Sequence, residues 1–174
     1  RAGSATLKYC IDRMLTKFET VTVVSALGNH DQDAAFAMGM VMEAYYANEP
    51  RVIIKQPESK FHFLEWGKCL IGIHHGDKIN ASRLCGTMTR LQAEAWGRTT
   101  FKRWWLGHIH HKTAQEHDSG ITLESFHTLA QSDKWHSTSG YGAESRITMI
   151  TLHKEWGEVS RMSPSLNLVR DAAA

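Results

Sequence analysis

Three short polar motifs, each close behind an apolar run, constrain the fold of this chain more than any other feature. The runs 21–24, 69–74 and 103–106 have the length and composition of β-strands. The motifs that follow them are, in chain order, Gly28-Asn29-His30-Asp31, His75-Gly76-Asp77 and Gly107-His108-Ile109-His110. Open α/β sheets place functional side chains at the ends of their strands. We therefore expect a layered α/β fold in which these motifs converge in one cleft.

Apolar residues at helical spacing predict helices between the strands. The first apolar stripe consists of Leu7, Ile11, Met14, Leu15 and Phe18, with Ser4 as its N-cap. A second helix is predicted from Asp33 to about Ala47, and a third on the face formed by Leu84, Met88, Leu91 and Ala95. Further strands are predicted at 51–55, 61–66, 121–129, 146–153 and 158–162.

Length and composition predict one globular domain over residues 1–174. Apolar residues make up 42% of the chain and charged residues 22%, and three Pro and 13 Gly leave no linker between domains. The formal charge of +2 is too small to indicate nucleic-acid binding by itself. Eleven histidines are unusual, and histidine is the commonest metal ligand.

The cysteines and the hydropathy of the chain point to a cytoplasmic protein. Cys10, Cys69 and Cys85 are odd in number and form no C-x-x-C pair, so we expect neither a disulfide framework nor a cysteine zinc site. No apolar run reaches membrane-spanning length, and no signal segment opens the chain. We therefore expect no membrane partner.

The three motifs contain residues that suit a transition metal. Imidazole nitrogens and amide or carboxylate oxygens favour Mn, Fe, Zn or Ni over calcium, which prefers oxygen throughout. His108 and His110 are two positions apart, so both can face one site on an extended segment. Any one such motif is more often an ordinary turn. Four histidines outside the motifs are predicted to be surface or core residues, namely His74, His111, His117 and His153.

The motifs together resemble the calcineurin-like metallophosphoesterase superfamily, whose pattern is D-x-H, G-D-x-x-D, G-N-H-[DE], H-G or G-H, then G-H-x-H. The last three elements occur here, between residues 28 and 110. The segments 133–136 and 139–141 are similar to members from phages and prophages. This resemblance implies a four-layer α/β/β/α sandwich and a dinuclear site with two divalent transition metal ions, manganese foremost.

The resemblance also implies a role for each motif residue. Asn29, His75 and His108 would bind the second metal ion, and His110 would bind the first. His30 would stabilise or protonate the scissile phosphate, helped by Asp31, so these two are the predicted catalytic residues.

Two elements of the family pattern are absent from this sequence. No D-x-H occurs, and the one Gly-Asp pair, Gly76-Asp77, already belongs to the His-Gly motif. Because the missing motifs follow interior strands of the family sheet, their loss would expose apolar faces and strand edges. We therefore expect the natural protein to begin upstream of Arg1, and this chain to lack the first strands and to be inactive alone. A degenerate, non-catalytic relative is the alternative.

A basic segment between the second and third motifs bears on the substrate. Glu94 is the one acidic residue from position 78 to 105, among six cations and several aromatic residues. Cations attract a polyanion and aromatic rings stack on bases, which favours a nucleotide or nucleic-acid partner. A solvated helix face with tryptophans in the core explains the segment slightly better. The cations are Lys78, Arg83, Arg90, Arg98, Lys102 and Arg103, and the aromatic residues are Trp96, Phe101, Trp104 and Trp105.

The function predicted from sequence is metal-dependent hydrolysis of phosphodiester bonds, with nucleotides or nucleic acid as candidate substrates. A phosphomonoesterase or protein phosphatase with the same site remains an alternative, as does a binding protein without catalysis. The substrate, the metal and the oligomeric state are not determined by the sequence.

Overall fold

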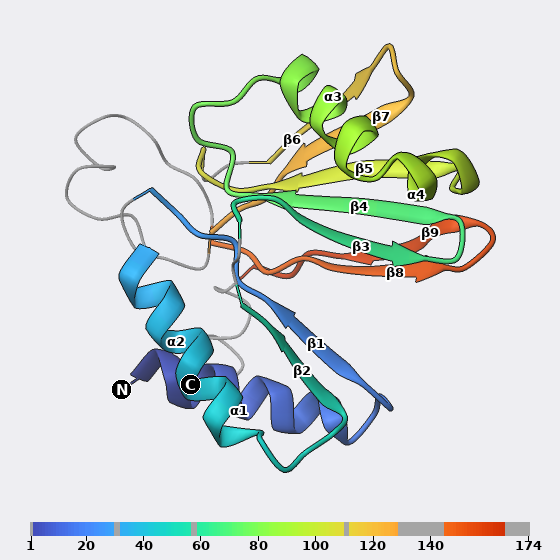
Figure 1. Ribbon diagram of the computed structural model, residues 1–174. Coiled ribbons are helices and arrows are strands. Elements are labelled where there is room, and N and C mark those ends of the chain that lie inside the picture. Colours follow the sequence, from blue (N-terminus) through green and yellow to red (C-terminus); the bar gives the residue numbers. More distant parts are fainter. Residues whose placement is uncertain (1, 30–31, 57–58, 110–111, 129–144, 166–174) are drawn as a thin grey trace. The chain divides into compact units, whose positions relative to one another are not determined.

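The computed structural model describes residues 2–29, 32–56, 59–109, 112–128 and 145–165 (Figure 1). Its contacts divide the chain into two compact units, Arg1–His62 and Phe63–Ala174. We describe each unit by itself.

The first unit is a β-α-β arrangement with one additional helix. It contains α1 (Ala2–Leu15), β1 (Val21–Val24), α2 (Gln32–Tyr45) and β2 (Val52–Lys55). β1 and β2 are parallel, and α2 is the crossover that a parallel pair requires. Ile11, Val21, Met42 and Tyr46 form the buried core, and the Tyr46 hydroxyl donates to Asp12 Oδ1 over 2.7 Å.

The predicted stripe of the first helix is confirmed in part. Leu7, Ile11 and Leu15, spaced by four, face the core of the first unit. Met14 is 46% exposed, and Phe18 lies beyond the last helical residue and is 61% exposed. Met14, three residues after Ile11, lies on the same side of the helix but at its margin in the last turn, where the core covers it only in part.

The second unit is built on a five-stranded mixed sheet in the order β3-β4-β5-β7-β6. β4, β5 and β7 are parallel, whereas β6 is antiparallel to β7. β8 and β9 form a separate antiparallel hairpin. The elements are β3 (His62–Trp66), β4 (Cys69–His74), α3 (Ala81–Leu91), α4 (Ala93–Arg98), β5 (Phe101–Leu106), β6 (Thr113–His117), β7 (Ile121–Ser125), β8 (Met149–His153) and β9 (Gly157–Met162).

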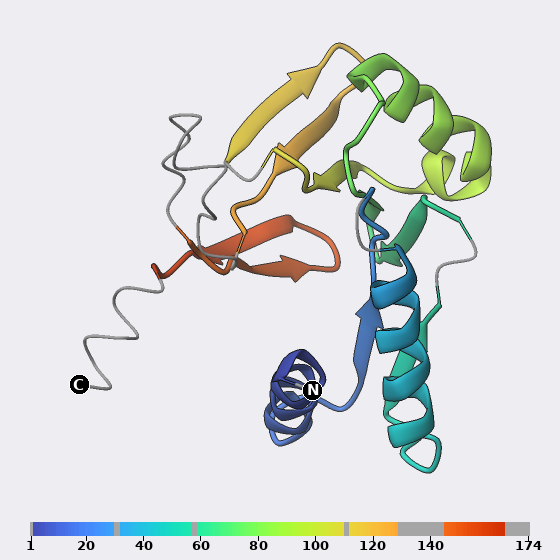
Figure 2. The same ribbon diagram turned by 90° about the vertical axis from the view of Figure 1, so that its left-hand side faces the viewer.

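The two faces of this sheet are covered differently, as Figures 1 and 2 show. Side chains alternate between faces along each strand. Leu70, Trp104 and Leu123 belong to one set, which lies under α3 and α4. Cys69, Arg103 and Glu124 belong to the other, which meets the β8–β9 hairpin. The second unit therefore has three layers: helices, sheet and hairpin.

The single helix predicted around Leu84 and Ala95 is divided into α3 and α4. Asn80 begins α3 as an N-cap, since its side-chain oxygen accepts the Arg83 backbone N–H over 2.9 Å. Gln92, at φ −127° and ψ 39°, leaves helical geometry and separates the two helices. Leu84, Met88 and Ala95 are buried as predicted, but Leu91 is 44% exposed.

The strand predictions differ from the structure mainly at three places. β6 was not predicted, because Thr113–His117 is a polar, largely exposed edge strand without apolar alternation. The strand predicted at 121–129 ends at Ser125, and the strand predicted at 146–153 begins at Met149. Arg146 forms only an isolated bridge with Ser165.

Three predictions about class and environment can be compared with the structure. The α/β class is confirmed by the mixed sheet and its helices. All three cysteines are free, and burial raises the pKa of the Cys69 and Cys85 thiols. Among the described residues, no helix is long and apolar enough to cross a membrane.

Candidate metal centre

Two of the predicted ligands follow neighbouring parallel strands. In the β4–β5 register His74 is opposite Leu106, so both strands reach the same edge of the sheet together. His75 comes directly after β4, and His108 comes two residues after β5. Their proximity thus follows from parallel pairing, although 33 positions separate them along the chain.

The two imidazole rings meet through their nitrogens. His75 Nε2 and His108 Nδ1 are 3.2 Å apart, and the rings are inclined at 68° with centroids 5.0 Å apart. His75 is half-buried, whereas His108 is exposed to solvent. The His75 ring is therefore partly covered by the protein, whereas the His108 ring is accessible to solvent.

This spacing fits two ligands of one transition metal ion. Nitrogens bound at about 2.0–2.1 Å lie about 3.0 Å apart for octahedral coordination and about 3.4 Å apart for tetrahedral coordination. The observed 3.2 Å lies between these values. The same contact satisfies the geometry of a hydrogen bond between the two rings, in which one nitrogen donates its hydrogen to the other. A bound metal ion would take the place of that hydrogen.

The backbone at His108 is held in a rare conformation. His108 has φ 66°, and the Ile109 N–H donates to the Gly107 carbonyl over 2.8 Å, which closes a three-residue γ-turn around His108. A γ-turn with positive φ at its centre is strained for a residue with a Cβ. Such strain is found preferentially at functional sites.

The loops after β4 and β5 are joined at the same place. The Gly107 N–H donates to the His75 carbonyl over 3.0 Å. Gly76 has φ 103°, and a Cβ there would lie 3.4 Å from the Gly107 carbonyl oxygen and 3.5 Å from the His108 Cβ. A Cβ would make only ordinary van der Waals contacts there, so glycine is favoured at position 76 by its positive φ.

The other predicted site residues belong to the first unit or lie outside the described residues. Asn29 lies in the loop after β1, in the first unit. His30, Asp31 and His110 lie outside the described residues, as do 133–136 and 139–141. Within the described ranges, no group of three His, Cys, Asp or Glu side chains could hold a metal ion. The described part of the candidate metal site therefore consists of two imidazole rings, those of His75 and His108.

The histidines outside the motifs include one core residue next to the site. His74 is 3% exposed, which agrees with its prediction as a surface or core histidine. His117 pairs its Nδ1 with the Ser119 hydroxyl at 2.9 Å, and His153 accepts the Glu155 N–H at 3.1 Å. His111 lies outside the described residues.

The basic segment is partly structural. Arg98 makes two hydrogen bonds of 2.7 Å to Glu65, and Arg103 pairs with Glu158. Lys102 donates to the Thr99 carbonyl and lies over the Trp96 ring, and Trp104 is fully buried. Lys78, Arg83 and Arg90 are exposed, and Arg98 is exposed as well although it is paired with Glu65.

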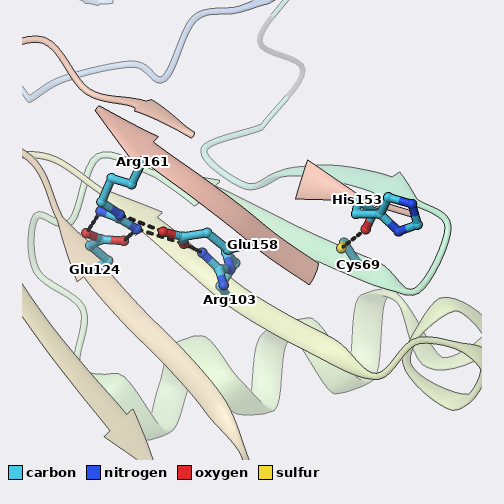
Figure 3. A network of polar contacts seen from close by, with 6 residues as sticks. All are labelled: Cys69, Arg103, Glu124, His153, Glu158 and Arg161. Carbon is cyan, nitrogen blue, oxygen red and sulfur yellow. Dashed lines mark hydrogen bonds and ion pairs between the residues drawn. The ribbon is translucent and has the colours of Figure 1, made fainter. Parts of the chain in front are cut away.

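A four-residue ionic cluster lies on the face of the five-stranded sheet that meets the β8–β9 hairpin (Figure 3). It was not predicted from the sequence. Arg161 on β9 binds Glu124 on β7 and Glu158 on its own strand, and Glu158 also binds Arg103 on β5. Hydrogen bonds from Arg161, and then from Arg103, lower the pKa of Glu158 to about 2 against the opposing effect of burial. No local pattern joins these residues, because they come from three separate strands.

A comparison with protein-family models finds no match, and neither does a comparison with curated protein sequences. One similar solved structure is a conserved uncharacterized protein, a predicted phosphoesterase, from Streptococcus pneumoniae TIGR4. It is 15% identical, with 93% of this chain and 90% of that chain covered and a TM-score of 0.38. Another is wild-type Vps29 complexed with Zn²⁺ from Entamoeba histolytica, 12% identical, with 92% and 89% covered and a TM-score of 0.41. Because both TM-scores are below 0.5, we base the functional proposal on this chain's own residues.

Proposed function

We propose that this chain contributes part of the active site of a metal-dependent phosphoesterase, and that His75 and His108 bind the same divalent transition metal ion. The observation that carries the proposal is the 3.2 Å separation of His75 Nε2 and His108 Nδ1 at the shared edge of two parallel strands. A strained backbone at one ligand and a glycine with positive φ beside the other support it. The hydrogen bond from the Gly107 N–H to the His75 carbonyl joins the two loops.

The remaining ligands and the catalytic groups are proposed from the motif resemblance. Asn29 would complete the second metal site, and His110 would bind the first metal ion. Two divalent ions, with manganese the first choice, supply an activated water and neutralise charge on the phosphoryl oxygens. His30, oriented by Asp31, would donate a proton to the leaving oxygen.

A phosphodiester is the proposed substrate class. Lys78 follows the His75 loop directly, and Arg83 and Arg90 lie on the adjoining α3, all exposed. Lys78 and Arg83, near the start of α3, provide positive charge on the His75 side of that helix, and Arg90 continues it in the last turn. Such a surface suits a nucleotide or nucleic-acid backbone. The cytoplasmic location and the similarity to phage proteins expected from sequence remain part of this proposal.

The experiment that tests the function uses the product of the complete gene. Bis-p-nitrophenyl phosphate should be hydrolysed in the presence of Mn²⁺, and faster than p-nitrophenyl phosphate. His75→Ala and His108→Ala should each reduce turnover at least 100-fold, whereas His117→Ala, a histidine away from the site, should not. Faster turnover of the monoester would indicate a phosphomonoesterase instead. No Mn²⁺-dependent turnover of either compound would favour a protein without catalysis.

A further inference from the structure

One peptide group beside the candidate metal ligand is hydrogen-bonded on both sides. The carbonyl oxygen of His75 accepts the Gly107 N–H over 3.0 Å. The N–H of the same peptide group, which belongs to Gly76, donates to the Nδ1 of His74 over 2.8 Å. The peptide between His75 and Gly76 is therefore oriented by the β5 loop on one side and by the preceding side chain on the other.

The second of these hydrogen bonds is partly buried, and the residue that accepts it is buried. His74 is the last residue of β4 and is 3% exposed, on the side of the sheet that carries Leu70 and Trp104. Because it accepts through Nδ1, its neutral ring carries its hydrogen on Nε2. A backbone N–H that loses its acceptor in such surroundings is costly, so the loop has a strong preference for this one arrangement.

The hydrogen bond to His74 is important because the residue that donates it, directly after His75, is a glycine. Gly76 has φ 103°, and without a Cβ it can adopt several other backbone conformations at little cost. A rotation of the peptide between His75 and Gly76 would turn the His75 carbonyl away from the Gly107 N–H, and would so release the hydrogen bond that holds the His75 loop against the His108 loop. The acceptor on His74 selects one orientation from this set.

We propose that His74 is a positioning residue that holds His75 in the orientation where its Nε2 meets His108 Nδ1. His74 itself touches neither metal nor substrate in this assignment, and acts through the Gly76 N–H. The inference rests on the proposed function for its consequence, namely metal affinity. Its immediate effect, protection of one amide, does not depend on that function.

A matched pair of variants separates the hydrogen bond from the packing. His74→Asn keeps an acceptor at the δ position, and His74→Leu has nearly the shape of Asn but no acceptor. Two quantities are measured in each protein: hydrogen exchange of the Gly76 amide by NMR, and the affinity for Co²⁺ from its visible absorption. Thermal unfolding reports the loss of packing common to both variants.

With His74→Leu, the Gly76 amide should exchange at least tenfold faster and Co²⁺ affinity should fall about 10–100-fold, the range for residues that orient a metal ligand. With His74→Asn, both quantities should remain within about threefold of the wild-type protein, because a conservative acceptor restores a contact of this kind.

Three results would overturn the inference. Unchanged Gly76 exchange in His74→Leu would show that the side chain does not hold the amide. Faster exchange with equal Co²⁺ affinity in the two variants would show that the amide does not position the ligand. Failure of the wild-type chain to bind Co²⁺ would overturn the proposed function, and the inference with it, whatever the amide shows.

Discussion

The two faces of the five-stranded sheet are held by different forces, although both act on the strands that carry His75 and His108. On the helix face, Leu70, Met88 and Trp104 are completely buried and contribute through apolar burial. On the hairpin face, Arg103, Glu124, Glu158 and Arg161 bind one another. Apolar burial is tolerant of small displacements, whereas paired charges require particular partners at particular positions. The helix face should therefore determine stability, and the hairpin face should determine how β9 is aligned on β5 and β7.

The largest expected effect is on the helix face. Trp104→Ala should lower the free energy of unfolding by about 3–5 kcal/mol, because it removes a fully buried ring and leaves a cavity. Denaturant unfolding monitored by circular dichroism measures this change. Trp156→Ala, at a site that is 72% exposed, is the matched control and should cost less than about 1 kcal/mol. Equal losses in the two variants would contradict the proposed importance of this face.

A smaller effect is expected when one charge is removed from the hairpin face. Glu124→Ala should lower the free energy of unfolding by about 1–3 kcal/mol, since it leaves Arg161 without one of its two carboxylate partners. Glu116→Ala, on the exposed edge strand β6, should change it by less than about 0.5 kcal/mol. The double variant Glu124→Leu with Arg161→Met should recover much of the loss, because replacing both partners removes the uncompensated charge. If the double variant were worse than Glu124→Ala, alignment by paired charges would not explain this face.

The smallest expected effect is the dependence on acid that Glu158 contributes on the hairpin face. The pKa of Glu158 is lowered from 4.5 to about 2, so its contribution to stability is complete above pH 4.5. This contribution is lost as the pH falls from 4.5 through about 2, because the unfolded state then binds the proton first. Glu158→Gln should therefore flatten the acid side of the stability profile, measured by urea unfolding from pH 7 to pH 2.5. Trp104→Phe should keep the wild-type slope, and a flattened slope there as well would remove the distinction between the faces.

The part of the fold that could be predicted from the sequence is the part that local pattern encodes. Val21–Val24 and Cys69–His74 were predicted with their observed ends, because short β-branched or apolar runs bounded by polar motifs are strong strand signals. β6 was missed, since Thr113–His117 depends on pairing with β7 and has no apolar face of its own. The helix break at Gln92 was missed for a similar reason, because both halves continue the same apolar face.

The candidate site likewise has a part that local sequence encodes and a part that depends on strand pairing. The resemblance of the motifs predicts His75 and His108 as ligands of one ion, but their contact could not be predicted, because it depends on the β4–β5 register. The role proposed for His74 could not be predicted from the sequence either, because it depends on the hydrogen bond from the Gly76 N–H. The ionic cluster was hidden for the same physical reason. Its residues are adjacent only after three strands are in place.

The central claim is that His75 and His108 bind the same metal ion, and titration of the chain with Co²⁺ tests it most directly. Nitrogen NMR of selectively labelled histidine reports each ring while absorption reports binding. The account predicts one ion that perturbs His75 Nε2 and His108 Nδ1 together, and His75→Ala and His108→Ala should each weaken binding by about as much as the double variant does. A Co²⁺ ion bound equally well by the double variant, or two ions that perturb the two rings independently, would contradict it.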